Sequence, residues 1–125
     1  MNRKNIPGTS PYEPIIGFSR AVRIGNVVHV SGTGPVGAED LSAVEQTRQV
    51  LTLIEKALHQ AGAKFEHVVR TRMFIAKPED WEEVGRAHGE VFGSIRPAAT
   101  MVIAQLLNPK WRVEMEADAV LPDAG

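Results

Sequence analysis

The 125-residue sequence contains no cysteine and few aromatic residues, namely two Trp, one Tyr and four Phe. Without cysteine, the chain can form neither a disulfide scaffold nor a thiol nucleophile nor a cysteine-ligated metal site. It contains no apolar run of 18 residues, which a membrane-spanning helix needs, and its first four residues lack the apolar stretch of a signal peptide. We therefore expect a cytoplasmic protein with no membrane partner.

The charge of the chain is nearly balanced, with 14 Lys and Arg against 15 Asp and Glu and a formal net charge of −1. This balance leaves no basic excess, so no nucleic-acid partner is predicted. The histidines show no metal-ligand spacing and no glycine-rich phosphate-binding motif occurs, so we predict no metal and no cofactor. The length predicts a single domain, residues 1–125.

Turn residues and hydrophobic periodicity divide the first half of the chain into predicted elements. Residues 1–16 contain three prolines and predict an extended N-terminal lead-in. Residues 21–24 and 27–30 are β-prone runs joined by Gly25-Asn26, which predicts a hairpin because both linking residues tolerate positive φ. Residues 42–45 fit a capping box, which predicts a helix that Gly62 ends.

The second half of the chain predicts a strand, a helix and two more strands. In the strand over residues 68–75, one side is predicted to carry Val69, Thr71, Met73 and Ile75. Pro78 opens the helix, whose apolar face is predicted to carry Trp81, Val84, His88 and Val91. Residues 99–106 and 112–120 predict the last two strands.

The resulting order, ββαβαββ, predicts an α+β fold with a mixed sheet of about five strands. Both helices should cover one face, because each connects strands by a right-handed crossover. The uncovered face would mix apolar side chains with charged ones: Val68, Arg70, Arg72, Phe74, Glu114, Glu116 and Asp118. A face of this kind is a poor solvent surface, so the sequence predicts that it forms an interface in an oligomer.

Three carboxylates, Glu114, Glu116 and Asp118, would project from one side of the last strand at intervals of about 7 Å. One of them could hold or activate a water, with its pKa set by burial and by a nearby arginine. The alternative is a solvated or ion-paired sheet face. Arg70 and Arg72 could likewise bind a substrate carboxylate or pair with these acids.

Two further segments are candidates for ligand binding. Pro97 biases Arg96 toward extended backbone at a strand entrance, where Arg96 could bind an anion or lie in solvent. Residues 31–34 offer small side chains and exposed amides at a strand end, which suit a carboxylate cradle but also an ordinary turn.

From Gly17 to Val120 the sequence resembles the Rid (YjgF) family, whose best-known branch hydrolyses reactive enamines and imines. The resemblance rests on these segments: Gly25-Asn26, Val30-Ser31-Gly32 with Pro35-Val36, Ala61-Gly62, Val68-Val69-Arg70-Thr71, Ile103-Ala104-Gln105-Leu106 and Val113-Glu114-Met115-Glu116-Ala117. It implies a chorismate-mutase-like fold and a homotrimer with a small-molecule cleft between each pair of subunits.

The resemblance also implies roles for single residues. Glu114 matches the glutamate that positions the attacking water, and Gly32 matches the glycine whose amide faces the ligand. Phe18 stands at the position of the cleft tyrosine and Thr100 at that of a strand cysteine. The archetypal carboxylate-binding arginine is replaced by Ala98, as in divergent subfamilies.

Arg96, two residues before Ala98, is the nearest arginine to the archetypal position, and Arg72 is the second candidate for an anion-binding group. We therefore expect Glu114 to be catalytic and a substrate-binding set of Arg96, Gly32, Ser31, Phe18, Thr100 and Arg72. The function expected is hydrolysis of reactive imines, enamines or related small carbonyl metabolites. The alternatives are a non-catalytic trimer that binds a metabolite or a partner protein and, third, the ribonuclease or translation-inhibitor activity named for some relatives.

Overall fold

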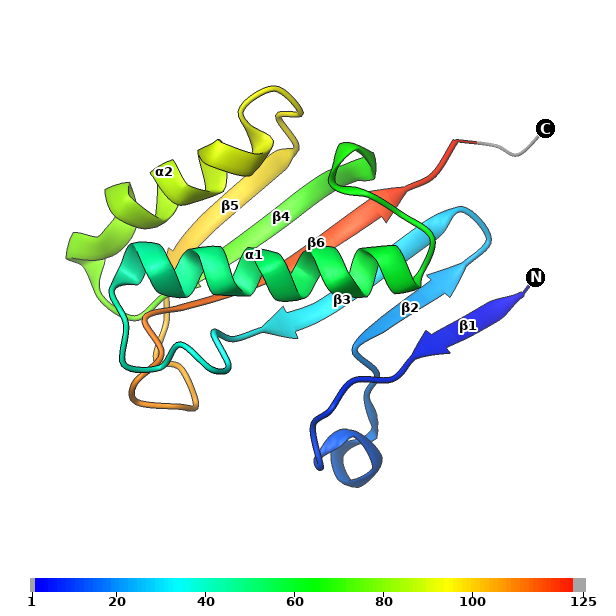
Figure 1. The fold of residues 1–125 in the computed structure, drawn as a ribbon, viewed down its shortest axis with the longest axis horizontal. Coiled ribbons are helices and arrows are strands. Elements are labelled where there is room, and N and C mark those ends of the chain that lie inside the picture. Colours follow the sequence, from blue (N-terminus) through cyan, green and yellow to red (C-terminus); the bar gives the residue numbers. More distant parts are fainter. Residues whose placement is uncertain (1, 123–125) are drawn as a thin grey trace.

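A six-stranded mixed sheet with two helices on one face is the framework of the protein (Figure 1). The structure, a computed structural model, describes residues 2–122. The strands are β1 (Arg3–Ile6), β2 (Ala21–Ile24), β3 (Val27–Thr33), β4 (Val68–Ile75), β5 (Ala98–Ile103) and β6 (Val113–Val120). Their order in the sheet is β1-β2-β3-β6-β4-β5, and only β4 and β5 pair in parallel. The predicted mixed sheet is thus confirmed.

Local sequence signals account for the hairpin and for the first helix. Gly25 takes a φ of +58° between β2 and β3, which a residue without Cβ adopts at little cost. Helix α1 (Ala43–Gln60) begins at Ser42, whose hydroxyl accepts a hydrogen bond of 3.2 Å from the amide of Glu45. Gly62, with a φ of +85°, follows the end of the helix. Both predicted elements are confirmed.

The second helix differs from its prediction at its first turn. A 3₁₀ turn (Pro78–Asp80) precedes α2 (Trp81–Phe92), whose buried residues are Val84, Ala87 and Phe92. Trp81 is 60% exposed, so its predicted place on the apolar face is wrong. Because the α-helix begins only at Trp81, the indole lies at the end of the helix and outside its contact with α1 and the sheet.

Strand β4 corrects the predicted alternation at its first two positions. A register shift relative to β6 lies between Val68 and Arg70. It brings Val68 into the core, whereas Val69 is 48% exposed. Further along, Thr71, Met73 and Ile75 face the helices as predicted. In β6, Val113, Met115, Ala117 and Ala119 alternate into the same core, which leaves the three acidic residues of that strand on the open face of the sheet.

The N-terminal segment contains more structure than an extended lead-in. Residues 3–6 form β1, which pairs with β2 and gives the sheet a sixth strand. Residues 13–17 form a single π-helical turn, so the extended prediction is wrong there. No helix within residues 2–122 is long and apolar enough to cross a membrane.

Candidate functional site

The open face of the sheet brings together several of the predicted site residues. Across β5, β4 and β6, one row consists of Thr100, Arg72 and Glu116. The next row toward the end of β4 consists of Val102, Phe74 and Glu114. The helices cover the opposite face (Figure 1). The candidate site therefore lies on the face that one protomer leaves uncovered.

The three carboxylates of β6 have different environments. Arg72 Nη1 lies 3.2 Å from a carboxylate oxygen of Glu116 and 3.2 Å from one of Asp118. Asp118 also contacts His29 Nδ1 at 2.7 Å. The side chain of Glu114 makes no hydrogen bond or ion pair with any residue among residues 2–122, although its backbone pairs with β4. The ion-paired alternative therefore applies to Glu116 and Asp118, and Glu114 keeps its oxygens free for another group.

Burial changes the acidity of Glu114. The half-buried position raises the pKa of its carboxyl above the ordinary glutamate value, and the neighbouring charge of Glu116 adds to the increase. The positive charge of Arg20 opposes it. A carboxyl group with a raised pKa is a stronger base once ionised and a better acid–base catalyst near neutral pH.

Gly32 packs directly against this carboxyl group. A Cβ atom at Gly32 would lie 3.4 Å from both Cδ and Oε1 of Glu114, so the missing side chain leaves the carboxylate accessible from β3. Neighbouring Ser31 donates from Oγ to the carbonyl oxygen of Ser19 at 2.6 Å. Ser31 thus binds the segment before β2, and its hydroxyl proton is already used within the protomer.

Arg20 is a residue of this region that the sequence did not indicate. Its Nη2 donates to the carbonyl oxygens of Ser31 and Gly32 and to Oγ1 of Thr33, each at 2.8 Å. No motif marks this arginine, because two of its three partners are main-chain carbonyl groups of another strand. Phe18, two residues earlier, ends the π-helical turn and is 36% exposed.

Arg72 and Thr100 lie on the same face but have partners of their own. Arg72 lies between Glu116 and Asp118, as the ion-paired interpretation predicted. Thr100 Oγ1 accepts a hydrogen bond of 2.8 Å from Nη2 of Arg70. Arg72 is therefore compensated by two carboxylates, which weakens it as a binding group for a substrate anion.

Arg96 lies far from Glu114 within the protomer. Ala98 pairs with Arg70, four residues along β4 from the Phe74 row that contains Glu114. Ala98 is therefore about 13 Å from that row along the strands, and Arg96 precedes the start of β5 by two residues. The predicted extended backbone is wrong at Arg96, which has a φ of +55°, and its Nε donates to the carbonyl oxygen of Gly93 at the end of α2.

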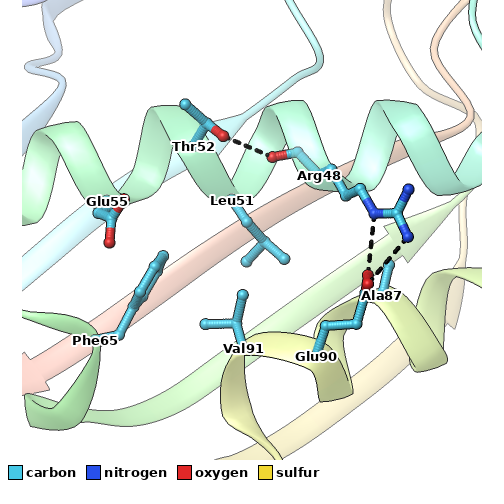
Figure 2. Close-up of a pocket in the computed structure, with 8 residues that line it drawn as sticks. All are labelled: Arg48, Leu51, Thr52, Glu55, Phe65, Ala87, Glu90 and Val91. Atoms are coloured by element: carbon cyan, nitrogen blue, oxygen red, sulfur yellow. Dashed lines mark hydrogen bonds and ion pairs between the residues drawn. The ribbon is translucent and has the colours of Figure 1, made fainter.

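A separate hollow of about 300 Å³ lies between the two helices (Figure 2). Leu51, Phe65 and Val91 form its apolar lining, and Arg48 crosses from α1 to bind both carboxylate oxygens of Glu90 on α2. The hollow contains none of the predicted site residues and lies on the helical side of the sheet. Among residues 2–122, no group of three or more His, Asp or Glu side chains is placed to hold a metal ion.

The family model described as Endoribonuclease L-PSP matches residues 8–121. The chain belongs to this family, which includes the YjgF proteins. The chain is similar to the crystal structure of a YjgF-family member from Mycobacterium tuberculosis, with a TM-score of 0.90 and 44% sequence identity. The alignment covers 96% of this chain and 100% of the Mycobacterium tuberculosis protein. This similarity confirms the predicted family and the sheet with two helices.

Curated relatives carry different names. An uncharacterised protein of Streptomyces coelicolor is 34% identical to this chain over 121 residues. The alignment covers 93% of this chain and 90% of the Streptomyces protein. A 3-aminoacrylate deaminase, RutC, of Acinetobacter baylyi is 29% identical over 117 residues, covering 90% of this chain and 91% of its own. The family thus includes proteins named as deaminases as well as the ribonuclease of the family name.

Proposed function

We propose that this YjgF-family protein is a hydrolase of small reactive imines or enamines and that Glu114 handles the attacking water. The observation that carries the proposal is the environment of Glu114. It is the one acid of β6 whose oxygens have no partner among residues 2–122, and burial raises its pKa. The named deaminase among the relatives supports the same chemistry.

In the proposed reaction, the Glu114 carboxylate accepts a hydrogen bond from water and takes its proton as the oxygen attacks the imine carbon. The C–O bond forms, the C=N π bond breaks and Glu114 passes the proton to the nitrogen, which gives a carbinolamine. Glu114 then takes the hydroxyl proton of this intermediate and delivers it to the amino nitrogen, so that the C–N bond breaks, ammonia leaves and the C=O bond of the carbonyl product forms. Water is the only co-reactant, and an enamine enters the same route as its imine tautomer.

We further propose that the site is completed in a homotrimer, in a cleft between two subunits. Strand β5 is an edge strand with the sequence Ala-Ala-Thr-Met-Val-Ile, which contains no charge. Val102 and Ile103 are 42% and 60% exposed. Uncharged apolar edges that remain open are rare in monomers, because they pair with other chains. A neighbouring subunit over this edge and the open face would also shield Glu114 and its water from bulk solvent.

The substrate class follows from the charges around Glu114. Ala98 supplies no cation at the position of the archetypal arginine, and Arg72 is neutralised by two acids. Loss of a charge-assisted bidentate contact costs on the order of 2 kcal/mol or more of binding free energy. We therefore expect neutral imines to be better substrates than 2-iminocarboxylates.

The test supplies imines generated in situ from several amino acids and amines and measures their loss with wild type, Glu114→Gln and Glu116→Gln. We expect Glu114→Gln to lose activity by a factor of about 100 or more and Glu116→Gln to keep it within about threefold, since both variants remove one acid from the same strand face. Equal rates for wild type and Glu114→Gln on every imine would contradict the proposal.

A second candidate, a trimer that binds a small acid without turnover, is favoured by Arg96, which is exposed, donates one side-chain hydrogen bond to a carbonyl oxygen and has no carboxylate partner among residues 2–122. It predicts that 2-oxo acids raise the melting temperature of a protein that has no hydrolase activity. The ribonuclease activity of the family name is disfavoured by the net charge of −1 and by the few exposed aromatic rings available to stack on bases.

A further inference from the structure

Arg20 lies where the start of β2 meets the end of β3, and all three of its side-chain hydrogen bonds come from one nitrogen. Nη2 donates to Ser31 O, Gly32 O and Thr33 Oγ1 at 2.8 Å each. Thr33 Oγ1 in turn donates to Ser31 O at 2.8 Å. A single charged group therefore holds the last three residues of β3 together.

This part of β3 is irregular and needs such a support. The pairing of β3 with β6 shifts register between Val30 and Thr33, so Ser31 and Gly32 lie outside the regular ladder. Their carbonyl groups bind Arg20 instead of a facing strand. Because the carboxyl of Glu114 packs against Gly32, the conformation of this bulge determines what can approach that carboxyl from β3.

Arg20 also acts on Glu114 through its charge. The charged groups that act on Glu114 are Glu116 on the same strand and Arg20 from the segment before β2. Glu13, in the π-helical turn, also acts on Arg20 through its charge and accepts hydrogen bonds from the amide of Gly8 with both carboxylate oxygens. Arg72 is paired with Glu116 and Asp118. Arg20 is thus the cation that partly offsets the effect of burial on the Glu114 pKa.

We propose that Arg20 is a positioning residue of the site. It fixes the Ser31–Thr33 bulge over Glu114 and supplies the positive charge that compensates the Glu114 carboxylate. This inference rests on the proposed hydrolase function for its kinetic consequences. It concerns a residue outside the motifs that relate the chain to its family. Arg20 also carries a structural cost, since its Nε is buried and has no hydrogen-bond partner within residues 2–122.

The geometry makes a specific prediction about substitutions. Lysine has three N–H donors on one charged nitrogen, so Arg20→Lys can replace the three bonds that Nη2 makes and keep the charge. Arg20→Met keeps an unbranched stem for packing but loses both the donors and the charge. Arg23→Ala is the matched control. Arg23 also binds main-chain carbonyls, those of Ala61 and Gly25, and none of the site residues.

The experiment combines imine-hydrolysis kinetics, circular dichroism and an NMR titration of the Glu114 carboxyl in the full-length protein. For Arg20→Met we expect kcat to fall by about tenfold to a hundredfold with a smaller change in KM, because misplacement of a reacting group affects the chemical step. The Glu114 pKa should rise in this variant and return to the wild-type value in Arg20→Lys. Arg23→Ala should match wild type in both readouts.

The outcomes separate this inference from the proposed function. If wild type hydrolyses no imine, the proposed function fails, whereas the NMR titration still decides the inference. A folded Arg20→Met with an unchanged Glu114 pKa and unchanged Gly32 amide resonance overturns it. If Arg20→Met does not fold, Arg20→Lys decides, since a folded lysine variant that loses activity or raises the Glu114 pKa also contradicts the positioning role.

Discussion

Gln46 offers a quantitative test of how the segment before Glu114 is held. Its side chain is fully buried in α1, and Nε2 lies 3.1, 3.2 and 3.1 Å from the carbonyl oxygens of Glu39, Leu41 and Lys110. Its Oε1 accepts from the amide of Arg112 at 2.7 Å. One side chain therefore joins the loop before α1 to the loop that leads into β6.

The Gln46→Leu substitution removes these bonds and inserts a side chain of similar size. The substitution removes three hydrogen-bonding groups, because the two N–H donors of Nε2 are shared by three carbonyls and Oε1 is one acceptor. A hydrogen bond contributes a net 0.5–1.5 kcal/mol, so we expect the free energy of unfolding to fall by about 3 kcal/mol. For a chain of this length, we expect the melting temperature to fall by roughly 10 °C. Loss of the bond to Arg112 should also loosen the start of β6, two residues before Glu114.

Urea denaturation followed by circular dichroism measures this effect, with all variants at one protein concentration because association stabilises the folded chain. The control is Gln49→Leu on the same helix, where Nε2 makes a single bond of 2.8 Å to the carbonyl oxygen of Val36 in a partly exposed position. We expect that variant to lose about 1 kcal/mol or less. Equal losses for the two variants would refute the reasoning.

Three further substitutions test other parts of the structure. Gly32→Ala should fold normally and slow imine hydrolysis, because its Cβ would meet the Glu114 carboxyl at ordinary contact distance. Gly34→Ala should instead destabilise the fold in thermal melts, because its Cβ would lie 2.4 Å from the ring of Trp111. Burial lowers the pKa of His88, so below about pH 6.5 the unfolded chain binds a proton that the folded chain does not. The free energy of unfolding should therefore fall as the pH decreases from 7 to 5, and His88→Gln should flatten this dependence. An equally steep dependence in that variant would assign the effect to another group.

Much of the fold could be predicted because its signals are local. The hairpin depends on Gly25-Asn26 and the start of α1 on Ser42, which act within a few residues of the chain. Strand β1 could not be predicted in the same way. Arg3-Lys4-Asn5-Ile6 has no hydrophobic alternation, and it forms a strand because the edge of β2 offers unpaired main-chain groups. The exposure of Val69 likewise follows from a register shift that no periodicity reveals.

The alternation of apolar and charged residues predicts which side chains of the candidate site share a face of the sheet. It does not predict contacts that depend on the local main-chain conformation. Alternation in β6 placed Glu114, Glu116 and Asp118 on one face, but their different roles depend on the cross-strand position of Arg72. Arg20 acts through carbonyl groups of a bulge, which carry no sequence signal. Arg96 was expected in extended backbone before Pro97, yet its left-handed φ and its bond to Gly93 place it at the end of α2.

The most direct test of the central claim, that the Glu114 carboxylate handles the attacking water, compares two pKa values. One is the pKa of Glu114 from NMR titration, assigned by loss of its signal in Glu114→Gln. The other is the pKa of the limb in which kcat/KM for imine hydrolysis rises with pH, which reports the free enzyme. We predict that the two coincide and lie above the ordinary glutamate value, because burial favours the protonated form. An activity limb that does not follow the titration of Glu114, or a Glu114 pKa at or below the ordinary value, would contradict the account.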